Sequence, residues 1–262
     1  MIRKYKILFL IAMTVMSFAT QSHAQDDVND EPQVLPPVVK SVMPESEILP
    51  DVKLLGKTHP EKIVFTQIKL AKGTPNIDQF ARNSPYVEQA QEIDKSAMIL
   101  SEYNRIGNSY NLHDQNANII VHAKLKTDEY SSLQDLIVFD ELDDTTYFQY
   151  NMYGYNVGIV PEDVQKFGKL ALSKARAENM FAAISSPGDD VIAEFMLKPV
   201  YADVTEPFEV NESNYWLMFA RIAELRLWSN ESPDNAQLLW YYRAPWYAPK
   251  DKSNINNLFV RE

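Results

Sequence analysis

A β-rich run of about nine residues begins directly after residue 60. Residues 61–69 are rich in β-branched and aromatic side chains, and this pattern predicts a largely buried β-strand. The two faces of the expected strand are Ile63, Phe65 and Gln67 on one side, and Val64, Thr66 and Ile68 on the other. We therefore expect the folded domain to start near Glu61.

Two helices are expected from the spacing of apolar residues and from the residues that flank them. Ser84 and Pro85 are typical of a helix N-cap and first turn, and Gly107 is the expected end of this first helix. The second helix is expected to begin at Pro161 and to end at the turn of residues 185–188. The predicted inner faces are Tyr86, Ala90, Ile93, Ala97 and Leu100 in the first helix, and Val164, Phe167, Ala171, Ala175 and Ala182 in the second.

Several further segments have the short apolar or alternating pattern of strands. They are residues 118–126, 133–139, 145–160, 191–203 and 237–242. We expect a turn at residues 140–144, and bulges or bends at Gly154 and Gly158. Residues 215–228 combine the composition of a helix with the alternation of a strand, and we interpret them as one arm of a hairpin whose turn covers residues 230–235.

The order of these elements predicts an α+β fold with a mainly antiparallel sheet and two main helices. A strand is followed by a helix with three strands and then by another helix with three strands, which suggests a duplicated α-β-β-β unit. The sequence has no obvious internal repeat that would prove the duplication. We expect one domain over residues 61–250 and a C-terminal tail over residues 251–262.

The N-terminal part of the chain has the pattern of an export signal followed by a linker. Residues 1–24 combine a basic start, an uncharged run over residues 7–20, and Ala24 before the expected cleavage site. The uncharged run is too short for a typical membrane span, so cleavage is favoured over an uncleaved anchor. Residues 25–60 contain six of the 15 prolines, many acidic residues and no aromatic residue, which predicts a disordered linker.

Charge and composition argue against several classes of function. The formal net charge of −11 disfavours nucleic-acid partners and anionic membrane surfaces. The chain has no cysteine, which excludes disulfides, thiolate metal sites and cysteine nucleophiles. No apolar segment after the leader is long enough to span a membrane. Together with the leader, these features predict a bacterial protein that is periplasmic or secreted.

Local motifs of the common enzyme classes are missing from the sequence. The seven glycines are not spaced as in a phosphate-binding loop, and no serine-hydrolase or zinc-peptidase motif occurs, so we expect no cofactor. His113, Asp114 and His122 could bind a metal ion, but their spacing matches no metal motif and we favour solvated side chains. The four carboxylates of residues 140–144 could bind calcium, although a charged hairpin turn is favoured.

Aromatic residues near the C-terminus give the strongest compositional signal. All four tryptophans lie after residue 215, and residues 240–247 combine aromatic side chains with an arginine. Such side chains anchor protein partners or stack on sugars, while the alternative is that they fill the core around a terminal strand. The candidate ligand-binding or partner-binding residues are Trp240, Tyr242, Arg243, Trp246 and Tyr247.

We therefore expect a non-enzymatic exported protein that binds an envelope protein or glycan through this aromatic surface. The alternative is a secreted carbohydrate-active enzyme, which would use paired carboxylates near residues 140–144 and the tryptophans as sugar platforms. A third hypothesis is a metal-binding protein that uses His113, Asp114 and His122.

Overall fold

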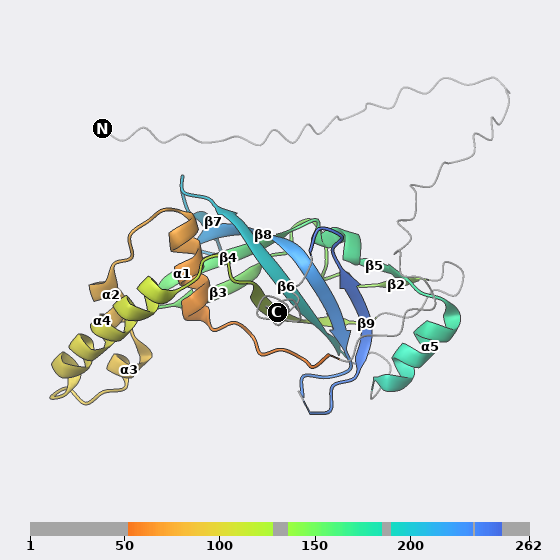
Figure 1. Cartoon of the computed structure of the whole chain (residues 1–262), viewed down its shortest axis with the longest axis horizontal. Helices are drawn as coiled ribbons and strands as arrows, with labels where there is room; N and C mark the ends of the chain where they lie inside the picture. Colours follow the sequence, from red (N-terminus) through yellow and green to blue (C-terminus); the bar gives the residue numbers. More distant parts are fainter. Residues whose placement is uncertain (1–51, 128–135, 185–189, 233, 248–262) are drawn as a thin grey trace, which may run out of the picture. The chain divides into compact units, whose positions relative to one another are not determined.

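A strand of 16 residues, β8 (Ser213–Trp228), is the central strand of the sheet (Figure 1). The computed structural model describes residues 52–127, 136–184, 190–232 and 234–247. The other strands of the main sheet are β1 (Ile119–Lys126), β3 (Phe148–Met152), β4 (Tyr155–Glu162), β6 (Asp190–Ala202), β7 (Phe208–Val210) and β9 (Leu238–Arg243). A separate small sheet consists of β2 (Leu136–Val138) and β5 (Lys169–Ala171).

Both edges of β8 are occupied by other strands. On one edge, β6 is antiparallel to β8, from Ala202 opposite Met218 to Ile192 opposite Trp228. On the other edge, β4 pairs in parallel with residues 216–221, and β9 pairs antiparallel with residues 224–228. The main path of the sheet is β1-β6-β8-β4-β3, and the sheet is mixed. The protein therefore has an α+β fold.

Residues 60–70 form a helix rather than the predicted strand. In α1 (Pro60–Leu70), proline occupies the first turn and the His59 side chain accepts a hydrogen bond from the backbone N–H of Glu61. Residues 63–68 are all buried, because α1 lies between the sheet and the ring of Tyr110. A helix that is covered on both sides has no polar stripe, so its sequence resembles a buried strand.

The predicted first helix is divided in two. Ser84 caps a helix as predicted, but α3 (Pro85–Glu88) has only four residues. A second helix, α4 (Lys95–Leu112), passes through Gly107, where we expected the helix to end. Together with α2 (Ile77–Arg82), these helices form one group of packed elements (Figure 1).

The predicted inner face of that first helix is largely in solvent. Tyr86, Ile93 and Leu100 are 62, 87 and 64% exposed. The buried residues of α4 are instead Glu102 and Ile106. A pattern of apolar positions does not reveal a buried glutamate, because its burial depends on polar partners from other elements.

The predicted helix from Pro161 is also wrong over its first half. Pro161 belongs to β4, opposite Ala220 of β8, and Asp163 then has a φ of 60°. A 3-10 turn (Val164–Phe167) and β5 follow before α5 (Lys174–Ala183) begins. Because the expected first strand and this helix both differ, the duplicated α-β-β-β unit is not confirmed. Among the described helices, none is long and apolar enough to cross a membrane.

Most of the later strands were predicted. The bounds of β1, β6 and β9 lie within about one residue of the predicted ones, and β8 confirms the interpretation of residues 215–228 as a strand. The segment 145–160, predicted as one strand, is instead divided into β3 and β4 by a turn that contains Gly154. The bulge or bend expected at Gly158 is absent, since Gly158 pairs in regular register with Gln149 and Leu217. The expected leader, most of the expected linker, residues 133–135 and the expected tail lie outside the described residues.

Residues 52–59, which we expected to belong to the linker, lie against the sheet. Leu54 is buried against Trp228 of β8. Thr58 makes two hydrogen bonds with Ile120 of β1, in which its N–H donates to the carbonyl oxygen at 2.9 Å and its hydroxyl accepts from the N–H at 2.8 Å. This segment therefore covers part of the sheet face that lies opposite α1.

The packing between the 3-10 turn and the loop before β3 can be tested by a substitution at Gly168. A Cβ atom at this position would lie 2.5 Å from the backbone oxygen of Leu142. Gly168→Ala should therefore lower the free energy of unfolding by about 1–3 kcal/mol, measured by urea denaturation. Gly56→Ala is the matched control, because a Cβ there meets no atom within 4 Å. Equal stability of the two variants would contradict this packing.

Candidate functional site

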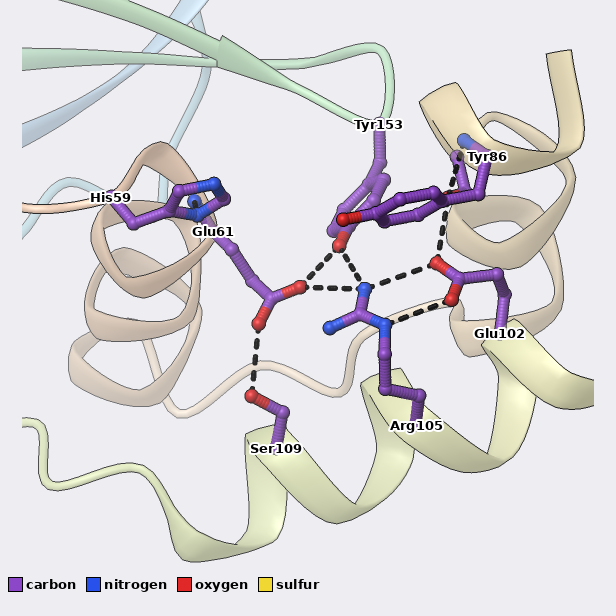
Figure 2. Close-up of polar contacts among 8 residues, drawn as sticks. His59, Glu61, Tyr86, Glu102, Arg105, Ser109 and Tyr153 are labelled. Atoms are coloured by element: carbon purple, nitrogen blue, oxygen red, sulfur yellow. Dashed lines mark hydrogen bonds and ion pairs between the residues drawn. The ribbon is translucent and has the colours of Figure 1, made fainter. Parts of the chain in front are cut away.

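Polar side chains from three elements meet between α1, α4 and the β3–β4 turn (Figure 2). Figure 2 shows Glu61 of α1, Arg105 and Glu102 of α4, and Tyr153 of the turn pointing toward one another. The Ser109 hydroxyl also donates a hydrogen bond to Glu61 at 2.9 Å. Glu61 and Glu102 are buried, whereas the Arg105 side chain is 40% exposed. We call these five residues the Arg105 cluster.

Arg105 binds both carboxylates of this cluster. Its Nε donates to Glu102 at 2.9 Å, and its Nη2 donates to Glu61 at 2.9 Å. The same Nη2 donates to the Tyr153 hydroxyl at 2.7 Å, and that hydroxyl in turn donates to the Glu61 carboxylate. Hydrogen bonds to ionised groups are the stronger ones in proteins, so the cluster links three elements tightly.

The hydrogen bonds determine how the cluster ionises. Burial alone would raise the pKa of Glu61, but the hydrogen bonds it accepts, first of all from Arg105, hold the pKa below its usual value. Burial opposes the same effect at Glu102, whose pKa is lowered by hydrogen bonds from Arg105 and from Ser84 at 2.6 Å. Burial and then the Glu61 carboxylate raise the pKa of Tyr153. At neutral pH both glutamates are therefore charged and Tyr153 keeps its proton.

Tyr153 fastens the tip of the hairpin to the helices. Its φ of 59° is unfavourable for a large side chain and is held by the surroundings. The ring stacks on Phe80 of α2 with centroids 5.4 Å apart, and Asn83 donates a hydrogen bond to the Tyr153 carbonyl at 3.0 Å. Every ionisable group of the Arg105 cluster is thus used in holding elements together, and the cluster offers no proton donor that is active near neutral pH.

A second buried charge network lies on the sheet face opposite α1. Arg226 of β8 donates to Glu194 of β6 at 2.9 Å and to Glu224 of β8 at 2.5 Å. Arg243 of β9 also donates to Glu224, and the backbone N–H of Leu55 donates to Glu194. Because both carboxylates are paired and buried, this network attaches β9 and residues 52–59 to the sheet.

Three of the predicted binding residues lie on β9 and point to different faces. Trp240 is 4% exposed and stacks on Tyr242 at 6.4 Å in the main core, where Phe167 contacts both rings. Arg243 lies on the other face and binds Glu224 at 2.8 Å. The structure therefore separates Arg243 from Trp240 and Tyr242.

Trp246 and Tyr247 follow β9 and lie near the surface. Trp246 is 41% exposed, and the guanidinium of Arg221 lies 4.2 Å from the centre of its ring. The ring of Tyr247 meets that of Trp246 edge to face at 5.9 Å. The Tyr247 hydroxyl accepts a hydrogen bond from Asn118 at 2.9 Å. The arginine thus makes a cation–π contact that favours this orientation of the exposed indole.

A cleft of about 160 Å³ lies beside Trp246, and we call it the β4–β9 cleft. It is lined by Glu162, Asp163, Lys166, Phe167, Arg221, Ile222, Tyr242 and Trp246. The sheet topology explains its position. The last paired residue of β4 faces Arg221, and the last paired residue of β9 faces Glu224, so two strands run toward each other along β8 and leave residues 222–223 between them.

The cleft combines aromatic rings with balanced charge. Its lining contains three aromatic, two acidic and two basic side chains. Arg221 lies between Trp246 and Glu162, whose carboxylate is 3.9 Å from the arginine Nε. Lys166 pairs with Asp163. This arrangement suits the binding of a ligand with both apolar and polar groups.

The histidines proposed as metal ligands lie in different surroundings, and neither is the exposed, solvated side chain that we expected. His113 Nε2 is 2.8 Å from the Thr66 hydroxyl, and burial together with the nearby Lys69 lowers the pKa of His113. His122 instead faces Glu194, with 3.6 Å between Nε2 and Oε2. Within the described residues, no group of three histidine or acidic side chains is arranged to hold a metal ion.

Residues 140–144 form a turn that is exposed except for the buried Leu142. It is not the predicted hairpin turn, because β2 pairs with β5 and β3 pairs with β4. The Asp143 carboxylate accepts hydrogen bonds from the hydroxyl and the N–H of Thr145 at 2.7 and 2.8 Å, and these bonds lower the pKa of Asp143. Glu141 accepts a hydrogen bond from the N–H of Lys126 at 3.1 Å. Asp143 is therefore ionised at neutral pH and is unsuited to be the proton donor of a glycosidase pair.

Several polar residues of these sites were missed from the sequence. Glu61 was placed at the start of a strand, although the succession His59, Pro60 and Glu61 is a helix-start signal that could have located α1. Arg221 carries no local motif, because its contact with Trp246 joins two strands that are distant in sequence. Comparisons of the chain with models of protein families, with curated proteins and with solved structures found no match.

The Arg105 cluster generates a pH-dependent prediction. The lowered pKa values of Glu61 and Glu102 mean that their contribution to stability is complete above the unfolded value of 4.5 and is lost as the pH falls through the folded values. Arg105→Met should cost about 2 kcal/mol at pH 7, toward the low end for a buried pair because the arginine is partly exposed.

Urea denaturation at pH 7 and again below pH 4 measures this effect. The difference between wild type and Arg105→Met should shrink in acid, since protonated carboxyl groups no longer require the arginine. The matched control is Arg82→Met, which removes an exposed ion pair with Asp78 and should change little. A loss for Arg105→Met that is equal at both pH values would contradict the charge-based role.

Proposed function

We propose that the protein is a non-enzymatic binding protein of the bacterial cell envelope that holds a protein partner in the β4–β9 cleft. The observation that carries the proposal is the Trp246 side chain, which is 41% exposed and is held by the Arg221 guanidinium at 4.2 Å. Tryptophan, tyrosine and arginine contribute most of the binding energy in protein interfaces, and all three line this cleft.

The size of the cleft favours a protein partner over a small molecule. Small-molecule sites usually have about 300–1,000 Å³, whereas this cleft has about 160 Å³. That volume suits one anchoring side chain of a larger partner. Because Arg221 already orients the indole of Trp246, little side-chain freedom is lost when the partner binds.

A photo-crosslinking amino acid at position 166 tests the proposal in the producing cells. Lys166 lines the cleft and its side chain is 56% exposed, so the probe would lie beside Trp246 without disturbing the core. A discrete adduct with one envelope protein is expected. Trp246→Ala should reduce that adduct by at least about tenfold, which is a typical effect of removing an interface anchor.

Two controls show whether the adduct reflects binding in the cleft. One excludes crosslinking that arises only because the probe is exposed, and the other excludes a loss of the adduct through unfolding. The probe at Ile93, which is 87% exposed and does not line the cleft, should give no such adduct. Trp246→Ala should shift the melting temperature by only a few degrees, because the ring is partly exposed. An adduct that persists in Trp246→Ala, or one that forms equally from position 93, would refute binding in the cleft.

The proposal also places the protein outside the cytoplasm, on the basis of the leader pattern of residues 1–24. Cell fractionation followed by intact-mass measurement should find a chain that begins at Gln25 in the periplasm or the medium. A cytosolic chain that retains Met1 would contradict export and would remove the reason to search for an envelope partner.

A further inference from the structure

One face of α4 is composed of residues that are poorly suited to a helix. Asn104, Gly107, Asn108 and Asn111 follow one another at the spacing of i, i+3, i+4 and i+7, and therefore form one stripe. Asparagine and glycine rank low in helix propensity, and glycine ranks lowest after proline. Four such residues on one stripe reduce the stability of the helix, which indicates a role other than helix formation.

Packing does not explain this stripe. The three asparagines are exposed, and a Cβ atom at Gly107 would meet no atom within 4 Å. Within the described part of the chain, none of the three asparagine amides has a hydrogen bond to another residue. The neighbouring stripe of α4, with Glu102, Arg105 and Ser109, is fully used in the Arg105 cluster (Figure 2).

The asparagine stripe instead lines an open, shallow cavity of about 380 Å³ on the surface between α4 and the start of α2. Two tyrosines stand in its lining, and Tyr103 is 46% exposed. Tyr110 is fixed in place, because its ring packs on Phe65 at 5.3 Å and the ammonium of Lys69 lies 4.9 Å from its centre. No residue of the lining carries a charge, although 23% of the chain is charged.

We propose that this cavity binds a neutral saccharide. A carboxamide donates and accepts hydrogen bonds at once, as a sugar hydroxyl does, and three amides in a row match a series of hydroxyl groups. The exposed Tyr103 ring offers a flat face for the C–H groups of a sugar ring and a hydroxyl for its edge, whereas the Tyr110 hydroxyl already donates to the Gly73 carbonyl. The volume falls in the range of small-molecule sites, and Gly107 keeps the floor of the cavity open.

An extended peptide is a less suitable occupant. A peptide would need apolar subsites for its side chains, and the apolar lining is limited to Pro75 and Ile77 beside the tyrosines. The lining itself carries no charge, and the nearby Lys69 ammonium already donates to the His113 carbonyl oxygen at 2.6 Å. Acidic sugars and phosphorylated ligands are therefore disfavoured, because they require basic partners. Hydroxyl-rich neutral ligands are the class that these side chains recognise.

The test is a titration of the protein that begins at Gln25, as expected after cleavage of the leader. The ligands are neutral hexasaccharides of glucose, xylose, mannose, galactose and N-acetylglucosamine. Nitrogen-15 NMR should show shifts of the side-chain amide signals of Asn104, Asn108 and Asn111 with at least one of them. Asn108→Ala should weaken that binding by about tenfold, the effect of losing a well-formed hydrogen-bonding group.

Gly107→Ala distinguishes a binding role of Gly107 from a purely structural one, because stability and saccharide binding should change in opposite directions. The alanine should raise the melting temperature by about 2–4 °C, because it favours the helix and meets no neighbour, while it weakens saccharide binding by about tenfold. The control on the same helix is Leu100→Ala, at an exposed position outside the cavity, which should leave binding unchanged. No shift with any hexasaccharide at millimolar concentration, or shifts of the same amides with a blocked neutral pentapeptide only, would overturn the proposal.

Discussion

The ionic hydrogen bonds of Arg105 with Glu61 and Glu102 are the interaction on which the arrangement of helices and sheet depends. Within its 18 residues, α4 buries only Ile106 and Glu102. Full burial of one isoleucine supplies about 1.5–3 kcal/mol, and the partly buried Ile99 and Tyr110 add less than that each, which is little to orient a helix of this length. Arg105 binds carboxylates from α1 and α4 and also the Tyr153 hydroxyl, and these hydrogen bonds fix the orientation of α4 relative to α1 and the β3–β4 turn. Such a network stabilises only when it is complete, since one buried charge without its partner is costly.

The second constraint is the length of β8, which has strands along both edges. Because β4 runs parallel to β8 and β9 runs antiparallel to it, the two strands end toward each other on the same edge. The pairing with β6 shifts register next to residue 223, where an extra residue of β8 is left without a partner. The β4–β9 cleft is thus a direct consequence of strand direction, and Arg221 and Trp246 meet there although 25 positions separate them.

The sequence predicts the strands better than the helices, for a physical reason. β1 is recognisable because its side chains alternate between a buried and a more exposed face, whereas β6 and β9 are recognisable as apolar runs between turn residues. α1 is buried on both sides, so its helical period is hidden. α4 buries a glutamate, so its inner face is polar. Trp246 could be nominated from composition, but Arg221 could not, because their contact depends on how β4 and β9 end on β8.

The Arg105 cluster and the asparagine stripe lie on the same helix, α4. The stability that the cluster contributes partly compensates for the poor helix formers of the stripe. Relative to alanine, one glycine and three asparagines weaken a helix by about 3 kcal/mol in total. The network around Arg105 offsets part of this loss, since removing the partly exposed arginine is expected to cost about 2 kcal/mol. A helix held by apolar burial alone would require alanine or leucine at such positions. Because the ionic hydrogen bonds of Arg105 hold one face of α4 in place, the adjacent face does not have to pack against the core. Its asparagine amides and Gly107 can therefore line the cavity.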